Sequence, residues 1–153
     1  MGDIPWWQRL LAVLVYLLPW SDALPFAQSL DNLIPGLQWL MVPAIPLLLL
    51  ESSVPFGGFL LFLVLFLAVV RNPRVPYYLR FNVLQAILLD IVLVVLSLAF
   101  QLLRLGSLGF AGRTLANTVF LGMLVLVVFA VVQCVRGKDA DIPSLSEAVR
   151  MQL

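Results

Sequence analysis

The order of apolar and polar residues divides the chain into five apolar segments separated by short polar stretches. A helix rises by about 1.5 Å per residue, so about 20 apolar residues cross the roughly 30 Å hydrocarbon core of a bilayer. Four segments approach this length and predict transmembrane helices at about residues 7–28, 54–71, 80–105 and 113–136. The pattern therefore predicts an all-α integral membrane protein in which residues 1–153 form a single membrane domain.

The fifth apolar segment, residues 36–50, would be only roughly 22 Å long as a helix. Pro43 and Pro46 interrupt it, and Glu51 ends it. A short segment that is broken by proline is more typical of backbone buried in protein or lying at the membrane surface than of a full span. We therefore expect an additional helical segment that is either re-entrant or interfacial.

Two polar stretches flank the predicted membrane region. After Pro19 and Asp22, apolar residues recur at helical spacing up to about residue 34, which predicts an amphipathic continuation at the interface. The tail at residues 137–153 is polar. Within it, Ser144 and Glu147 have the spacing of a capping box, which predicts a short helix from about residue 145.

The positions of the basic residues favour four spans. With four, seven of the nine basic residues lie on one side of the membrane, and only Arg104 and Arg113 lie on the other. With five spans, six basic residues lie on one side of the membrane and three on the other. Because basic residues concentrate in cytoplasmic loops, four spans with both termini in the cytoplasm, or its organellar equivalent, are predicted.

Composition and absent residue types narrow the function. Hydrophobic residues make up 63% of the chain and charged residues 11%, with a net charge of +1, which excludes a nucleic-acid-binding module and a disordered chain. The chain has no histidine and one cysteine, Cys134, which is expected to act as a small hydrophobic residue. Hydrolases that use a histidine base and histidine-ligated metals are excluded. We expect no enzyme, no cofactor and no metal site.

Polar residues inside the apolar segments are candidate functional groups, because they are costly in a membrane. Asp90 lies near the middle of the 80–105 segment, and Gln101 and Arg104 fall on nearly the same side of that helix. Asn82 and Gln85 lie on an adjoining sector. We expect these side chains to face another helix or a water-filled path.

The neighbouring segments carry further polar groups. Thr114, Thr118 and Gly122 share one side of the 113–136 segment and predict a surface on which another helix packs closely. Asp22, close to Pro19, is another candidate for the polar interior. Two interpretations stay open: the polar groups hold the bundle together, or they line a path or contact face for a partner chain.

Three stretches resemble a known family. They are Tyr16-Leu17-Leu18-Pro19, the run from Val70 to Ile91 that contains Arg80-Phe81-Asn82, and the pair Asn117-Thr118 together with the tail from Gly137 to Ala148. In sequence and order they are similar to the Tic-twenty family, the integral subunits of the protein translocon in the chloroplast inner envelope and their cyanobacterial and plastid-encoded homologues. The resemblance implies four helices with both termini stromal or cytoplasmic. Its motif residues here are Arg80, Asn82, Gln85, Asp90, Asn117 and Thr118.

The resemblance and the residues together suggest several functions. The first is a component of a protein-translocation channel, in a cyanobacterial plasma or thylakoid membrane or in the plastid inner envelope. Its partners would be other membrane subunits, translocating polypeptides and lipid, and not nucleic acid. The alternative is a structural or assembly subunit of a larger membrane complex, for example a photosynthetic one. An ion or solute channel using Asp22, Asp90 and Arg104 is less favoured, because one small bundle offers few pore-lining polar groups.

Overall fold

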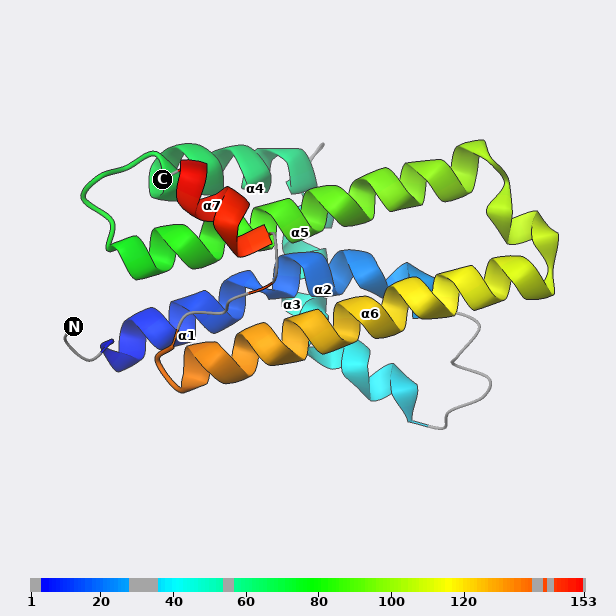
Figure 1. Ribbon diagram of the computed structural model, residues 1–153, viewed down its shortest axis with the longest axis horizontal. Coiled ribbons are helices and arrows are strands. Elements are labelled where there is room, and N and C mark those ends of the chain that lie inside the picture. The colour runs from blue at the N-terminus through cyan, green and yellow to red at the C-terminus, as the bar shows by residue number, and fades with distance from the viewer. Residues whose placement is uncertain (1–3, 28–35, 54–56, 139–141, 143–144, 153) are drawn as a thin grey trace.

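The structure is a computed structural model that describes residues 4–27, 36–53, 57–138, 142 and 145–152. Every regular element in these ranges is helical, as the sequence predicts (Figure 1). The elements are α1 (Trp6–Val15), α2 (Leu17–Ala23), η1 (Leu24–Ala27), η2 (Leu37–Ala44), α3 (Ile45–Ser52), α4 (Gly57–Leu65), η3 (Phe66–Val70), α5 (Tyr77–Leu102), η4 (Leu105–Leu108), α6 (Phe110–Val135) and α7 (Leu145–Gln152).

The two longest helices, α5 and α6, are each 26 residues long and apolar enough to cross a membrane. At about 1.5 Å per residue each extends for roughly 39 Å. Pro76, in an extended conformation, precedes α5, and Gly109, with φ +66°, precedes α6. The spans predicted at 80–105 and 113–136 are therefore present as helices that begin about three residues earlier.

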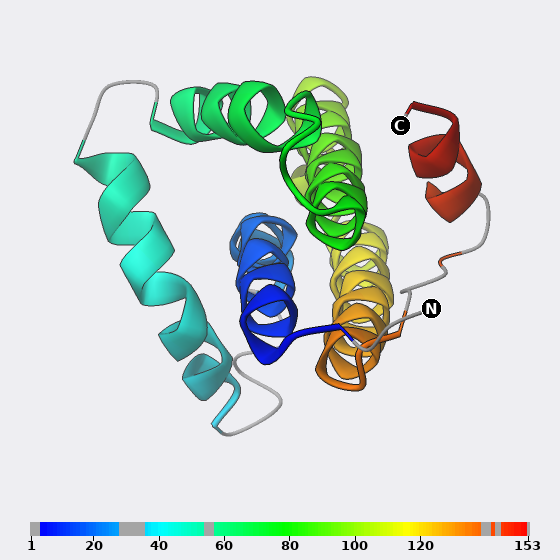
Figure 2. The same cartoon turned by 90° about the vertical axis from the view of Figure 1, so that its left-hand side faces the viewer.

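The first apolar segment forms two nearly collinear helices, α1 and α2, which lie between α5 and α6 (Figures 1 and 2). The helix is interrupted at Tyr16, one turn before Pro19. The break has a physical cause: proline has no N–H to bond to the carbonyl of Val15, and its ring crowds that carbonyl. The continuation predicted up to about residue 34 is helical to Ala27, and the rest of it lies outside the described residues.

Residues 42–52 and 57–70 form a bent pair of helical segments with an angle of 100° between them. The span expected at 54–71 is represented by α4 and by η3, a single π-helical turn, which are nine and five residues long. These are too short to cross a bilayer unaided, but the bent pair together is long and apolar enough to count as one candidate span. The described residues thus contain two clear candidate spans and a third if the pair is one span.

The core lies where α1 and α2 pack against α5 and α6. Tyr16, Trp20, Leu93 and Phe120 are buried there, and the Trp20 and Phe120 rings have centroids 5.7 Å apart. A second apolar cluster joins η3, α5 and α7 through Val70, Phe81, Leu84, Ile87 and Val149. By contrast, α3 and α4 bury none of their side chains and present an apolar surface suited to lipid.

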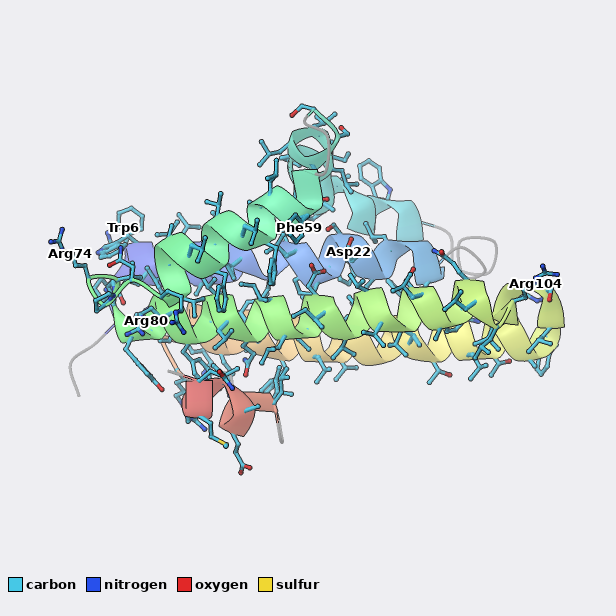
Figure 3. The ribbon with its side chains drawn as sticks, turned by 90° about the horizontal axis from the view of Figure 1, so that it is seen from above. Trp6, Asp22, Phe59, Arg74, Arg80 and Arg104 are labelled. Atoms are coloured by element: carbon cyan, nitrogen blue, oxygen red, sulfur yellow. The ribbon has the colours of Figure 1, made fainter. Side chains whose placement is uncertain are left out.

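Basic residues lie at both ends of the bundle but concentrate at one. Figure 3 shows Trp6, Arg74 and Arg80 at one end and Arg104 at the other. At the first end Nη1 of Arg9 donates to the carbonyl of Val135 at 3.4 Å, which joins the beginning of α1 to the end of α6. The tail helix predicted from residue 145 is present as α7, which starts at Leu145. Its proposed cap, Ser144, lies outside the described residues.

Candidate functional site

Asn82 and Gln85 on α5 lie at the centre of a buried hydrogen-bond network. The hydroxyl of Tyr16, at the break between α1 and α2, donates to Oδ1 of Asn82 at 2.9 Å. The same hydroxyl accepts a hydrogen bond from Nε2 of Gln85 at 3.0 Å. All three side chains are fully buried, so the network fastens the break in the first helix pair to α5.

The network continues into α6 and α7. Oε1 of Gln85 accepts a hydrogen bond from the hydroxyl of Ser146 at 2.7 Å, and that hydroxyl accepts one from the backbone N–H of Ile142 at 2.6 Å. The thiol of Cys134 donates to Oδ1 of Asn82 at 3.3 Å. We call Tyr16, Asn82, Gln85, Cys134 and Ser146 the Tyr16 network; it connects four helical segments of the chain.

Each member of the Tyr16 network has a partner, as buried polar groups in a low-dielectric interior require. Through these bonds Asn82 and Gln85 join α5 to the first helix pair and to α7. Sequence reasoning missed Tyr16 and Ser146 as their partners, because these residues are 66 and 61 positions away along the chain. The signal that could have pointed to Tyr16 is its position as a single tyrosine in an apolar run, one turn before Pro19.

Arg80 has a local structural contact. Its Nε donates to the carbonyl of Val70 at 3.0 Å, where η3 ends. Carbonyls at the end of a helix have no partner within the helix, and a guanidinium satisfies them well. Arg80 thus fixes the turn between η3 and α5.

The predicted intramembrane acids, Asp22 and Asp90, meet across α2 and α5. Both carboxyl groups line the same cavity, so two acids from different helices lie close together inside the bundle. Oδ1 of Asp90 is buried and has no hydrogen-bond partner among the described residues. Figure 3 places Asp22 between the two ends of the bundle, beneath Phe59 of α4.

A third acid, Glu51 of α3, joins this pair in one cavity of about 420 Å³. We call it the carboxyl cavity; its walls are Asp22, Glu51, Gly58, Phe59, Phe62, Asp90, Ile91, Val94 and Val95. From the sequence, Glu51 was expected only to end an apolar segment. It reaches the cavity because the bend between α3 and α4 turns this part of the chain toward α2. In the described part of the chain, no cluster of acids and cysteine has an arrangement that could hold a metal ion.

Other predicted residues lie away from both sites. Gln101 and Arg104 are exposed at the far end of α5, where Arg104 has φ +51°. Asn117 is half-buried on α6. Thr118 is exposed and its hydroxyl donates to the carbonyl of Thr114 at 2.8 Å, within its own helix.

Thr114, Thr118 and Gly122, expected to form a helix-packing surface, pack against no other helix among the described residues of this chain. Both threonines are exposed, and a side chain at Gly122 would meet nothing within 4 Å among the described residues. Threonine hydroxyls that bond to a carbonyl four residues earlier are satisfied within the helix and do not need a neighbouring helix.

The fold and sites define a helical, multi-segment membrane protein with a buried polar network and a carboxyl-lined cavity. Residues 3–149 match the family model described as "Chloroplast import apparatus Tic20-like". This match covers nearly the whole chain, so the chain belongs to the Tic20 family, the Tic-twenty family that its motifs resemble.

Individual relatives agree with this assignment. A "Tic20 family protein" of Synechocystis is 39% identical over 95% of this chain and 92% of its own length. "Protein TIC 20-II, chloroplastic" of Arabidopsis thaliana is 34% identical, covering 95% of this chain and 72% of the plant protein. "Tic20 family protein Ycf60" of Gracilaria tenuistipitata var. liui is 31% identical over 100% of this chain and 78% of its own length.

Proposed function

We propose that the chain is a component of a protein-translocation channel in a cyanobacterial membrane or in the plastid inner envelope. The observation that carries this proposal is the family match over residues 3–149, whose description names a chloroplast import apparatus. The relatives that support it include chloroplast and cyanobacterial proteins. The residues offer no catalytic pair of nucleophile and histidine base, since the chain has no histidine.

The proposal includes four spans: α1 with α2, the bent pair, α5 and α6. Both termini would lie on the side where Arg9, Arg74 and Arg80 gather, which would be the cytoplasm or stroma. The hydrogen bond between Arg9 and the carbonyl of Val135 supports a common side for the beginning of α1 and the end of α6.

The carboxyl cavity is the proposed contact site for a translocating polypeptide. Intramembrane acids in a cavity supply hydration and attract basic residues in a passing chain. One small bundle cannot enclose a polypeptide, so other membrane subunits or further copies would complete the path. In this arrangement Gln101 and Arg104 would lie at its outer end, and the exposed side of α6, with Asn117 and Thr118, would contact those subunits.

Site-specific photo-crosslinking tests this contact. A photoreactive amino acid replaces Phe59, which is 60% exposed and lines the carboxyl cavity. The matched control replaces Leu121, which is 47% exposed on α6. With an arrested precursor in native membranes, we expect precursor adducts from position 59 and few from position 121. Equal labelling from both positions, or none from either, would contradict the proposed path.

A second variant separates function from assembly. Asp90→Leu removes a carboxyl oxygen that has no hydrogen-bond partner among the described residues, and the carboxyl cavity of about 420 Å³ has room for the larger leucine side chain, so we expect the protein to fold and assemble normally. Translocation of a precursor should fall. If transport is unchanged, and mild-detergent extraction recovers stable photosynthetic subunits in place of precursors, the chain is an assembly subunit.

A further inference from the structure

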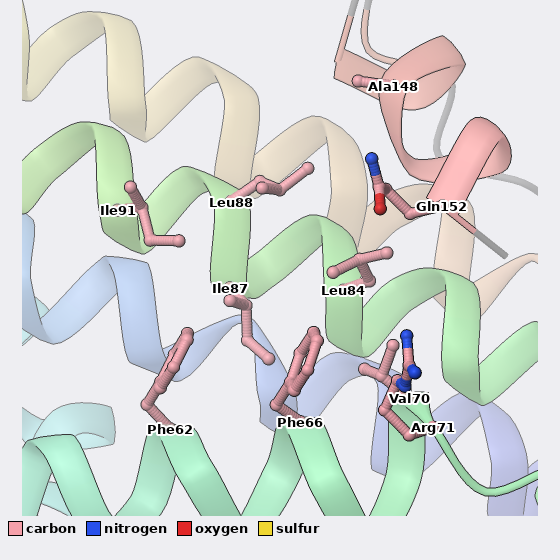
Figure 4. Close-up of a pocket in the computed structure, with 10 residues that line it drawn as sticks. All are labelled: Phe62, Phe66, Val70, Arg71, Leu84, Ile87, Leu88, Ile91, Ala148 and Gln152. Atoms are coloured by element: carbon pink, nitrogen blue, oxygen red, sulfur yellow. The ribbon is translucent and has the colours of Figure 1, made fainter.

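A second cavity lies on the other side of Phe62, between α4, α5 and α7. It has a volume of about 230 Å³, and we call it the α4–α5 groove (Figure 4). Its walls are Phe62, Phe66, Val70, Arg71, Leu84, Ile87, Leu88, Ile91, Ala148 and Gln152. The groove exists because α4 makes few close backbone contacts with α5, while η3 packs firmly on it.

The interior of the groove is apolar, whereas its mouth, the end lined by Arg71 and Gln152, is polar. The rings of Phe62 and Phe66 stack with centroids 6.1 Å apart and form one wall. Figure 4 shows Arg71 and Gln152 toward the right-hand end, on opposite sides of Leu84, and Phe62 and Ile91 toward the left-hand end. From Leu84 to Ile91 the floor follows about two turns of α5, roughly 10 Å.

Positive charge is concentrated near the mouth. Arg71 lines it and is exposed, and Arg80 is hydrogen bonded to the carbonyl of Val70, another residue of the groove. Arg150 on α7 lies over the ring of Phe81, at 5.2 Å. The described acidic residue on α7 is Glu147, so the mouth keeps an excess of positive charge.

We propose that the α4–α5 groove binds an anionic diacyl lipid, with one acyl chain between Phe62, Phe66 and Ile87 and the headgroup at Arg71. An engineered apolar cavity of roughly 150 Å³ accepts a benzene molecule, so this groove has room for a stretch of acyl chain. A helix about 10 Å across does not fit into it. Basic pockets between helices on the cytoplasmic side are suited to acidic headgroups.

The apolar groove and the arginines at its mouth contribute differently to the choice of lipid. Lipid tails are as apolar as the groove, so the groove alone does not choose among lipids. Selection therefore rests on the arginines at the mouth. Because Phe62 and Ile91 line both cavities, an acyl chain in the groove would lie beside the carboxyl cavity.

Native mass spectrometry of the full chain tests the proposal. The protein is purified into nanodiscs with equal amounts of phosphatidylglycerol and phosphatidylcholine, and the lipids retained after release are counted. We expect preferential retention of phosphatidylglycerol. Arg71→Gln should reduce that preference about fivefold, which corresponds to about 1 kcal/mol for one basic residue near a membrane surface. Arg113→Gln, an exposed arginine on α6, is the matched control and should leave the preference unchanged.

A groove-filling variant tests the acyl-chain position. Ala148 is exposed on α7 and lines the groove, so Ala148→Trp should reduce retention of both lipids, whereas Ala111→Trp on α6 should not. An unchanged free energy of unfolding would show that α7, whose Val149 is buried in the second apolar cluster, is still docked. Equal retention of both headgroups by the unmodified protein, or equal loss in the Arg71 and Arg113 variants, would overturn the proposal. Capture of a polypeptide in place of lipid by a photoreactive residue at position 148 in native membranes would also overturn it.

Discussion

Removing the hydroxyl of Tyr16 tests the Tyr16 network most directly. Tyr16→Phe keeps the ring in its fully buried site but deletes two hydrogen bonds, to Asn82 at 2.9 Å and from Gln85 at 3.0 Å. Asn82 keeps a second donor in the thiol of Cys134. Nε2 of Gln85 loses its hydrogen bond to the Tyr16 hydroxyl.

The expected loss of stability follows from these contacts. A side-chain hydrogen bond between membrane helices contributes about 0.6 kcal/mol on average and up to about 1.7 kcal/mol. Leaving a buried donor without a partner costs about 1–3 kcal/mol. For the two bonds of Tyr16 we expect the free energy of unfolding to fall by about 1–3 kcal/mol.

Reversible unfolding in bilayers or mixed micelles measures this change. Tyr77→Phe is the matched control, because Tyr77 begins α5 but is 51% exposed. If the free energy of unfolding falls by the same amount in both variants, to within about 0.5 kcal/mol, the reasoning is refuted. Combining Tyr16→Phe with Gln85→Leu should cost less than the sum of the single changes, since the two residues share a bond.

Three further predictions concern the backbone, the thiol and the topology. Gly137→Ala should lower the free energy of unfolding by at least about 1–2 kcal/mol in the same assay. Gly137 has φ +73°, and a Cβ at this position would lie 2.8 Å from Nη2 of Arg9. The control, Gly122→Ala, should be neutral or stabilising, because a Cβ there meets nothing within 4 Å among the described residues. The buried Cys134 should resist maleimide in the folded protein and become reactive in Tyr16→Phe, and equal labelling would contradict this. Cysteines replacing Arg74 and Arg104 should be labelled by impermeant reagents from opposite sides of the membrane, and labelling from one side would refute the proposed topology.

The sequence predicted the long helices well, because their signals are local. A run of apolar residues bounded by Pro76 and Gly109 determines α5 and the beginning of α6 without reference to the rest of the chain. Helix α7 also begins at Leu145, as predicted from the spacing of Ser144 and Glu147, while the cap itself lies outside the described residues. For these elements, composition and backbone chemistry indicate the same structure.

The sites could be predicted only in part. Asp22 and Asp90 were recognisable as unusual acids in apolar segments, but the participation of Glu51 depends on a 100° bend that no periodicity encodes. Asn82 and Gln85 were selected for their polarity, whereas their partners Tyr16 and Ser146 come from distant helices. Tertiary contacts of this kind are set by packing, and a local pattern contains no information about them.

The placement of α1 and α2 between α5 and α6 has a consequence for biogenesis. Helices α1 and α2 are synthesised well before α5 and α6, and the contact between Arg9 and Val135 spans 126 residues. Until α5 has been made, the hydroxyl of Tyr16 and the acid of Asp22 are in the bilayer without their neighbours on that helix. The nascent chain therefore depends on whatever holds α1 and α2 at the insertion site, and a chain truncated before α5 would expose those polar groups to membrane proteases.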